Sequence, residues 1–242
     1  MSDAGASVAA MHIILIPGLW LDASSWDDVI PALREAGHEP HSVTLPGVGE
    51  PADRSGEIGI TEWVGAVVDL IDRLDGDVVL VGHSGGGNVA WGAADRRVDR
   101  VGRVILVDTL PPTPGGMIWE FPIVDGVAPF PGWDTFEERE IRDLSEAVRV
   151  AVAQRALSVP AQVPTDAITL TDERRHRVPM TVLMGTASAD EISSLLEDPP
   201  PWAAELAASE HLSIVEIDSG HWPQFSVPDE LARMLIAAIR ED

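Results

Sequence analysis

Short apolar runs alternate along this chain with longer segments in which apolar residues recur at helical spacing. The runs are too short for helices and end at Gly, Pro or Asp, which is typical of strands buried in a parallel sheet. We predict strands at 12–16, 41–45, 77–81, 103–107, 180–184 and 212–217. Strands that alternate with helices indicate an α/β fold, with a mostly parallel central sheet and helices on both of its faces.

The segments between these runs predict amphipathic helices. Ser25 is a possible N-cap for a helix that runs to about Ala36 and is closed by Gly37. Thr61 is a possible N-cap for a helix that runs to about Leu74. In this second helix the apolar positions fall on one face: Trp63, Val64, Val67, Val68 and Ile71. Two further helices are expected, one around 89–93 and an amphipathic one at 228–239.

From 109 to about 177 the alternation stops. This segment is rich in Pro and contains a cluster of aromatic residues, Trp119, Phe121, Phe130, Trp133 and Phe136. One helix is expected in it, at about 136–156. We interpret the whole chain, 1–242, as a single domain in which 109–177 is a cap inserted between two strands.

The composition excludes several classes of site. The sequence contains no Cys, so disulfides and thiolate metal sites are ruled out. Residues 1–10 carry no basic residue and no apolar core, so we expect a loose tail and no signal peptide. No apolar run approaches the ~18 residues needed to span a bilayer. We therefore expect a cytoplasmic protein, either a monomer or a homodimer.

The chain is strongly acidic. It has 16 basic residues, all of them Arg, against 40 acidic ones, which gives a formal net charge of −24. No basic stripe is available to neutralise phosphates, which argues against nucleic acid as a partner. The same charge disfavours anionic membranes and strongly anionic substrates. We interpret the acidic excess as a highly soluble surface.

The candidate nucleophile is Ser84. Its surroundings, Gly82-His83-Ser84-Gly85-Gly86, fit the G-x-S-x-G pattern of a nucleophile elbow. A serine on a sharp turn from strand to helix is held in strained geometry, so its neighbours must lack bulk. The turn exposes the hydroxyl and directs the next backbone N–H groups toward a developing oxyanion. Here the pattern follows an apolar strand and precedes a helix; the alternative is a Gly-rich turn beside a structural serine.

The candidate general base is His221, which lies just after the last predicted strand. A loop at the carboxyl end of a strand is well placed to reach Ser84. The alternative is a solvated or packing histidine. His83 is expected to pack behind the elbow. The remaining histidines are expected to be structural or exposed, with no spacing typical of a metal site: His12, His38, His41, His176 and His211.

Two carboxylates compete to orient this base. Asp108 ends the strand after the nucleophile strand, and Asp190 follows the strand at 180–184. Either could approach His221, and we favour Asp108. The alternative role of Asp108 is to cap the loop that follows it, and that of Asp190 is to cap a helix over 191–196.

An oxyanion hole requires two N–H donors. Gly85, directly after the nucleophile, would supply one. Leu19, in the loop after the first strand, would supply the other, because Gly18 allows a close backbone approach; the alternative for this loop is an ordinary turn. The expected lining of a substrate pocket is aromatic: Trp20, His83, Trp119, Phe121, Trp133 and Trp222.

Four segments resemble the α/β-hydrolase superfamily, in the order expected and over about 12–240: IPGLW, LPGVGEP, VGHSGGG and SGHWPQFSVPDEL. The chain is most similar to small bacterial esterase-like members. It departs from many members at Ile16-Pro17, where they carry a His, and at Ser188, where they carry the acid. Haloalkane dehalogenases and zearalenone-type lactonases place the acid as Asp108 is placed. Dehalogenation is disfavoured because it uses an aspartate nucleophile in place of Ser84.

The resemblance and the residues together predict a cofactor-free, metal-free hydrolase for a small or medium apolar ester or lactone. A lyase or perhydrolase would reuse the same three residues, although a lyase usually needs a charged partner in the pocket and the chain has no Lys. A non-catalytic binding protein of the same fold is the third possibility.

Overall fold

The structure is a computed structural model and describes residues 10–240. Its centre is a six-stranded sheet in the order β2-β1-β3-β4-β7-β8, and every neighbouring pair is parallel. The strands are β1 (His12–Ile16), β2 (Glu39–Ser42), β3 (Val78–His83), β4 (Val101–Val107), β7 (Met180–Met184) and β8 (Leu212–Glu216). The predicted mostly parallel sheet is therefore confirmed. The predicted tail at residues 1–10 lies outside the described residues except for Ala10.

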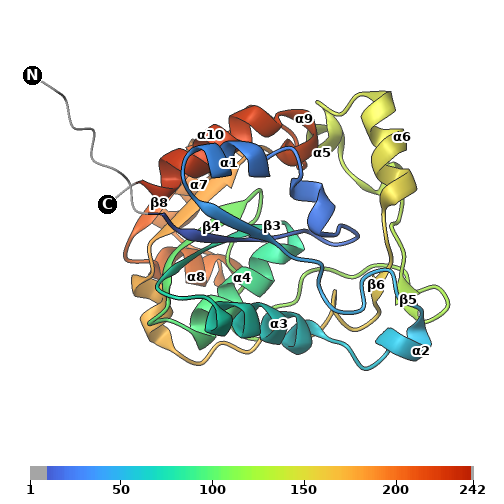
Figure 1. The fold of residues 1–242 in the computed structure, drawn as a ribbon, viewed down its shortest axis with the longest axis horizontal. Coiled ribbons are helices and arrows are strands. Elements are labelled where there is room, and N and C mark those ends of the chain that lie inside the picture. The colour runs from blue at the N-terminus through green and yellow to red at the C-terminus, as the bar shows by residue number, and fades with distance from the viewer. Residues whose placement is uncertain (1–9, 241–242) are drawn as a thin grey trace, which may run out of the picture.

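Helices cover both faces of the sheet, with α1 and α10 on one side and α3 and α4 on the other (Figure 1). The helices outside the 109–177 segment are α1 (Ile30–Glu35), α2 (Ala52–Ser55), α3 (Ile60–Arg73), α4 (Gly85–Arg96), α7 (Ala189–Glu197), α8 (Ala204–Ala208), α9 (Pro223–Ser226) and α10 (Pro228–Ile239). Within the described residues, no helix combines the length and the apolar character needed to cross a membrane.

The pleat of the sheet divides the core in two. Ile14 and Ile16 of β1 pack with α3 and α4, while Ile13 and Leu15 pack with α1 and α10. All four side chains are fully buried. Both faces of the sheet are thus apolar, which explains why the strands appear in the sequence as continuous apolar runs.

Two predicted boundaries at the start of the chain are wrong. Ser25 does not begin a long helix: it lies within the 3₁₀ helix η1 (Ala23–Trp26), whose N-cap is Asp22. The chain then turns before α1 begins, with Pro31 in its first turn, as suits a residue without an N–H. The strand expected at 41–45 ends at Ser42, because the apolar Leu45 packs into the core from the following loop.

Between β4 and β7 the chain runs through a long segment, here called the insertion. Its elements are β5 (Val127–Ala128), η2 (Trp133–Thr135), α5 (Glu138–Ile141), α6 (Glu146–Arg155), β6 (Val159–Pro160) and η3 (Glu173–Arg177). Of these, β5, β6, α5 and α6 lie beyond one end of the sheet, on the right of Figure 1. The single helix expected at 136–156 is wrong. The chain breaks before Ser145, whose hydroxyl accepts a hydrogen bond from the N–H of Val148 and so begins a second helix.

A buried ion cluster attaches the end of this insertion to the sheet layers. Arg175 of η3 lies 2.7 Å from Glu205 of α8 and 3.1 Å from Asp95 of α4, and all three side chains are at most 6% exposed. Removing Arg175 would leave two buried carboxylates without their shared counter-ion, at a cost of about 3–5 kcal/mol. The cluster therefore fixes where the insertion returns to β7.

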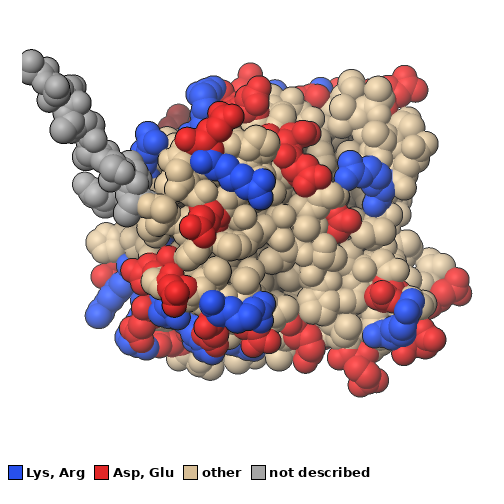
Figure 2. Space-filling model, in the orientation of Figure 1, with Lys and Arg blue, Asp and Glu red and all other residues tan. Residues whose placement is uncertain are grey.

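The charged side chains are intermingled on the face shown in Figure 2. There the Arg side chains lie among Asp and Glu side chains, mostly along two borders of that face, with uncharged surface between them.

Candidate active site

Ser84 lies on the turn between β3 and α4. Its φ of +51° and ψ of −126° form a conformation that residues with a side chain rarely adopt. A methyl group at Gly82 would lie 2.5 Å from the carbonyl oxygen of Gly86, and one at Gly86 would lie 2.5 Å from that of Pro17. The glycines of the motif are therefore needed for the close approach of three backbone segments, as the sequence predicted.

Backbone strain is concentrated at this place. Among the described residues, the non-Gly residues with positive φ are Trp20, Ser84, Asp108 and Asp125. The first three line one cavity. Strain of this kind costs about 1–3 kcal/mol per residue and persists where the surrounding structure enforces it, which is common at functional sites.

His221 reaches Ser84 from the loop after β8. Its Nε2 lies 2.9 Å from Ser84 Oγ, within hydrogen-bond distance. Its backbone N–H donates to the carbonyl oxygen of Glu140 in α5, at 2.7 Å. The imidazole is therefore positioned from two directions, by the strand that precedes it and by the insertion.

Asp108 lies on the other side of the imidazole. Its Oδ2 accepts from His221 Nδ1 at 2.5 Å, and its Oδ1 accepts from the backbone N–H groups of Gly185 and Thr186 at 2.8 and 2.9 Å. Burial raises the pKa of this carboxyl, but the hydrogen bonds from His221, Thr186 and Gly185 outweigh it and hold the pKa below its usual value. The carboxylate is thus ionised and has 1% side-chain exposure.

The second candidate acid lies elsewhere. Asp190 is in the first turn of α7 and is exposed. The N-cap of this helix is Ser188, whose hydroxyl accepts from the N–H of Glu191 at 3.2 Å. The structure therefore brings Asp108, and not Asp190, to His221.

His83 packs behind the elbow, as expected. Its Nε2 lies 2.7 Å from the carbonyl oxygen of His221, which can only accept, so this nitrogen carries the proton. Its Nδ1 accepts from the side-chain amide of Gln224 at 3.2 Å. Burial, together with the nearby His221, lowers the pKa of His83 to about 3. The ring is neutral and holds the backbone of the loop that carries His221.

A cavity of about 410 Å³ opens above Ser84. Trp20, Trp119, Phe121 and Trp222 of the predicted lining border it, and so does His83. The prediction is wrong for Trp133: its ring packs edge-on against Trp222, and its indole N–H donates to the carbonyl of Arg149. Trp133 therefore supports a wall of the cavity from behind.

Leu19 and Gly85 lie side by side at the base of this cavity. A methyl group at Gly85 would lie 3.1 Å from Leu19 Cγ and 3.1 Å from Ile118 Cδ1. Gly85 is the first residue of α4, so its N–H is among those that a helix leaves without an internal partner. The two backbone segments proposed from the sequence to bind an oxyanion are thus adjacent to Ser84.

The sequence also matches a known protein family. Residues 13–234 match the model of the alpha/beta hydrolase family. The chain belongs to the α/β-hydrolase family. The resemblance stated from its motifs is confirmed.

Curated relatives match this α/β-hydrolase over part of its length. It is 36% identical over 107 residues to a carbendazim-hydrolysing esterase from a Nocardioides species, which covers 43% of this chain and 44% of that protein. It is 31% identical over 107 residues to a pyrethroid hydrolase from Sphingobium wenxiniae, which covers 43% and 37%. The matched stretch is less than half the length of either relative.

Solved structures match this α/β-hydrolase over nearly its whole length. An extracellular α/β-hydrolase from a Paenibacillus species superimposes with a TM-score of 0.76 at 22% identity, covering 96% of this chain and 100% of the other. A methylesterase from Arabidopsis superimposes with a TM-score of 0.70 at 22% identity, covering 95% and 99%. These matches show that the fold is shared.

Sequence reasoning missed several residues of the site in this hydrolase. Ile118 and Phe136 line the cavity, and α5 contacts the loop that carries His221. Arg142 reinforces this contact by donating to the carbonyl of Ser219 at 2.7 Å. Phe136 belonged to the aromatic cluster seen in the sequence, which was the available signal. Glu140 makes its contact through its backbone carbonyl, so the identity of its side chain could not have predicted it.

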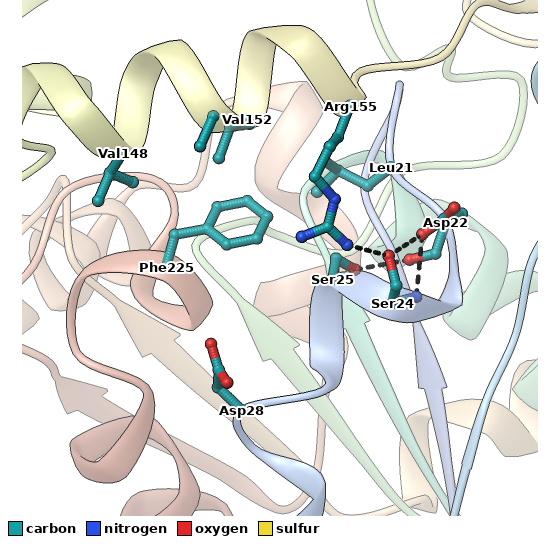
Figure 3. Close-up of a pocket in the computed structure, with 10 residues that line it drawn as sticks. Leu21, Asp22, Ser24, Ser25, Asp28, Val148, Val152, Arg155 and Phe225 are labelled. Atoms are coloured by element: carbon teal, nitrogen blue, oxygen red, sulfur yellow. Dashed lines mark hydrogen bonds between the residues drawn. The ribbon is translucent and has the colours of Figure 1, made fainter.

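A smaller hollow of about 180 Å³ lies outside this site, between η1 and α6 (Figure 3). Val148, Val152 and Phe225 form its apolar side. At the end of α6, the guanidinium of Arg155 donates to Ser24 Oγ at 2.6 Å. Because this charge is engaged within the protein, we assign no ligand to the hollow.

Proposed function

We propose that this protein is a serine hydrolase that cleaves a small or medium apolar carboxylic ester or lactone. The observation that carries the proposal is the continuous hydrogen-bonded chain from Ser84 through His221 to the buried Asp108 at the base of an aromatic cavity. The two relatives that align with it over 107 residues are named as an esterase and a hydrolase, which supports the same class of reaction.

Each residue has a defined part in this reaction. Ser84 Oγ attacks the carbonyl carbon while His221 Nε2 takes its proton, and Asp108 stabilises the imidazolium that forms. The N–H groups of Leu19 and Gly85 bind the oxyanion. His221 then gives the proton to the departing alkoxide as the carbonyl–oxygen bond breaks. Water, deprotonated by His221, hydrolyses the acyl-enzyme and releases Ser84.

The lining of the cavity favours uncharged, apolar acyl or alkoxy groups. Its aromatic and aliphatic side chains supply dispersion contacts and exclude water. Arg139, the basic residue of the lining, is paired with Glu137 at 2.9 Å, and Glu140 lies beside them. The rim is therefore acidic on balance, which disfavours carboxylate-bearing substrates.

The decisive experiment replaces the nucleophile. Across a panel of p-nitrophenyl esters and lactones of graded acyl length, we expect Ser84→Ala to lower kcat/KM by about 10⁴–10⁶-fold. Ser188→Ala, which changes the N-cap of α7, is the matched control and should keep its activity. A fluorophosphonate probe should add one mass increment at Ser84 of the unmodified protein. Full activity of Ser84→Ala on every ester that the unmodified protein cleaves would refute the proposal.

The same fold can carry a lyase, a perhydrolase or a binding protein. Product analysis in ¹⁸O-labelled water separates these, because only acyl-enzyme hydrolysis places solvent oxygen in the released acid. The pairing of Arg139 with Glu137 favours the hydrolase, since it leaves no isolated cation in the described lining for lyase chemistry. A folded protein that never reacts with the fluorophosphonate would instead indicate a binding protein.

A further inference from the structure

A second group of chemically active side chains lies at the end of the sheet opposite Ser84. His12 begins β1 and pairs in register with Val78, the first residue of β3, whereas Ser84 follows the last residue of β3. Glu39 and His41 lie beside His12 on the edge strand β2. The cavity above Ser84 includes none of these three residues.

The register of β1 and β2 explains why these side chains meet. His12 pairs with Glu39, and Ile14 pairs with His41. Side chains two positions apart on a strand share a face, and paired residues of parallel neighbours project to the same side. Residues far apart in the sequence are thereby placed together, which is why their spacing along the chain gave no sign of a site.

The ligand atoms are spaced as a metal ion requires. His12 Nδ1 lies 3.1 Å from His41 Nε2 and 3.3 Å from Glu39 Oε2, and all three atoms lie within 4.8 Å of one another. A tetrahedral zinc ion with bonds of about 2.0–2.1 Å holds its ligand atoms about 3.3 Å apart. Two of the three separations already match this edge of a tetrahedron.

Exposure and charge also suit a cation. The His12 side chain is 22% exposed and the Glu39 side chain is 63% exposed, so an ion can enter and water can fill a fourth position. The formal net charge of −24 raises the concentration of cations near the surface. Two imidazoles with one carboxylate favour zinc and its neighbours in the transition series over magnesium or calcium, which prefer oxygen.

We propose that His12, Glu39 and His41 form a binding site for a divalent transition metal, with Zn²⁺ as the ion that fits best. The bound ion joins β1 to the edge strand β2, which has β1 as its single neighbour in the described sheet. Its effect is on the stability of this edge. It takes no part in the proposed ester cleavage, so the two proposals can fail separately.

The test is a titration of the tag-free, full-length chain with Zn²⁺ in an excess of Mg²⁺, followed by calorimetry. We expect one strong site per chain and a higher thermal midpoint with Zn²⁺. His12→Ala and His41→Ala should each weaken binding by at least about tenfold, and Glu39→Gln should weaken it too. His211→Ala, which removes an exposed histidine beside β8, is the matched control and should bind as the unmodified chain does.

Equal Zn²⁺ affinity in the unmodified chain and the three ligand variants would overturn the proposal. So would the absence of any strong site, which would leave a hydrogen bond between the two imidazoles as the full explanation of their contact. If a variant fails to fold without metal, the visible spectrum of Co²⁺ bound to the unmodified chain tests the proposal instead. An intense visible spectrum of four-coordinate Co²⁺ supports the site, and the weak spectrum of six-coordinate Co²⁺ refutes it.

Discussion

At the scale of single residues, the sequence left one choice open, between Asp108 and Asp190. Both follow strands, β4 and β7, that are neighbours in the sheet, so both loops lie at the same edge. The structure shows what separates them. The loop after β7 does not supply the acid; its N–H groups at Gly185 and Thr186 bind Asp108, and Ser188 begins a helix that carries Asp190 outward. The choice between the two carboxylates therefore depends on how the loop after β7 packs.

We therefore expect Asp108→Asn to lower kcat by about 10⁴-fold, because the amide keeps the shape but cannot stabilise the imidazolium, and because it favours the wrong tautomer of His221. Asp190→Asn should leave kcat within about twofold, since Asp190 is exposed and has no bond to His221. Steady-state kinetics on the best ester of the panel would measure both variants. Comparable losses of kcat in the two variants would show that Asp108 is not the acid that orients His221.

At the scale of elements, the predicted bounds agree best with the structure where an element packs into the core. The strand at Met180–Met184 and the helix at Pro228–Ile239 have the bounds that the apolar pattern predicted, because burial against the sheet determines that pattern. The helix α3 has the predicted apolar face but a different start. It begins after Gly59, whose N–H donates to Glu62 Oε2, and Asp166 of the insertion accepts from the N–H of Ile60 at 3.2 Å.

The predicted N-cap, Thr61, is therefore not the residue that caps α3. A cap that comes from 106 positions along the chain cannot be recognised from local sequence. We expect Asp166→Ala to lower the free energy of unfolding by about 1 kcal/mol, the usual loss for a helix cap. Thr61→Ala, at an exposed position inside the helix, should change it by less than about 0.5 kcal/mol. Urea unfolding of the two variants tests this, and a larger loss in Thr61→Ala would restore the original prediction.

At the scale of the whole molecule, His83 connects the strand that carries the nucleophile to the loop that carries the base. Both ring nitrogens are engaged, with His221 and Gln224, and the side chain is buried. The sequence placed His83 behind the elbow but could not show these partners, since both lie more than 130 positions away. The consequence is that folding requires this histidine to be neutral.

That requirement makes stability depend on pH. In the unfolded chain His83 binds a proton below its ordinary pKa of 6.5, whereas in the folded chain its pKa is lowered to about 3. Between these values the unfolded state holds more protons, so the free energy of unfolding falls as pH falls. The contribution of His83 approaches about 1.4 kcal/mol per pH unit and vanishes above pH 6.5. The lowered pKa values of Asp108 and Glu205 add a loss only at more acidic pH, near and below their ordinary values of 3.8 and 4.5.

Urea unfolding at pH 7, 6 and 5 therefore reports mainly on histidines. We expect His83→Gln, whose amide can still donate to the carbonyl of His221, to be less stable than the unmodified chain at pH 7 but to lose less stability on acidification. His211→Gln, at an exposed histidine, should keep the full pH dependence. If His83→Gln and the unmodified chain lost stability in parallel from pH 7 to pH 5, the acid sensitivity would have to come from His38 and His41, whose pKa values are also lowered by burial. In that case the neutral His83 would not be what limits the folded state in mild acid.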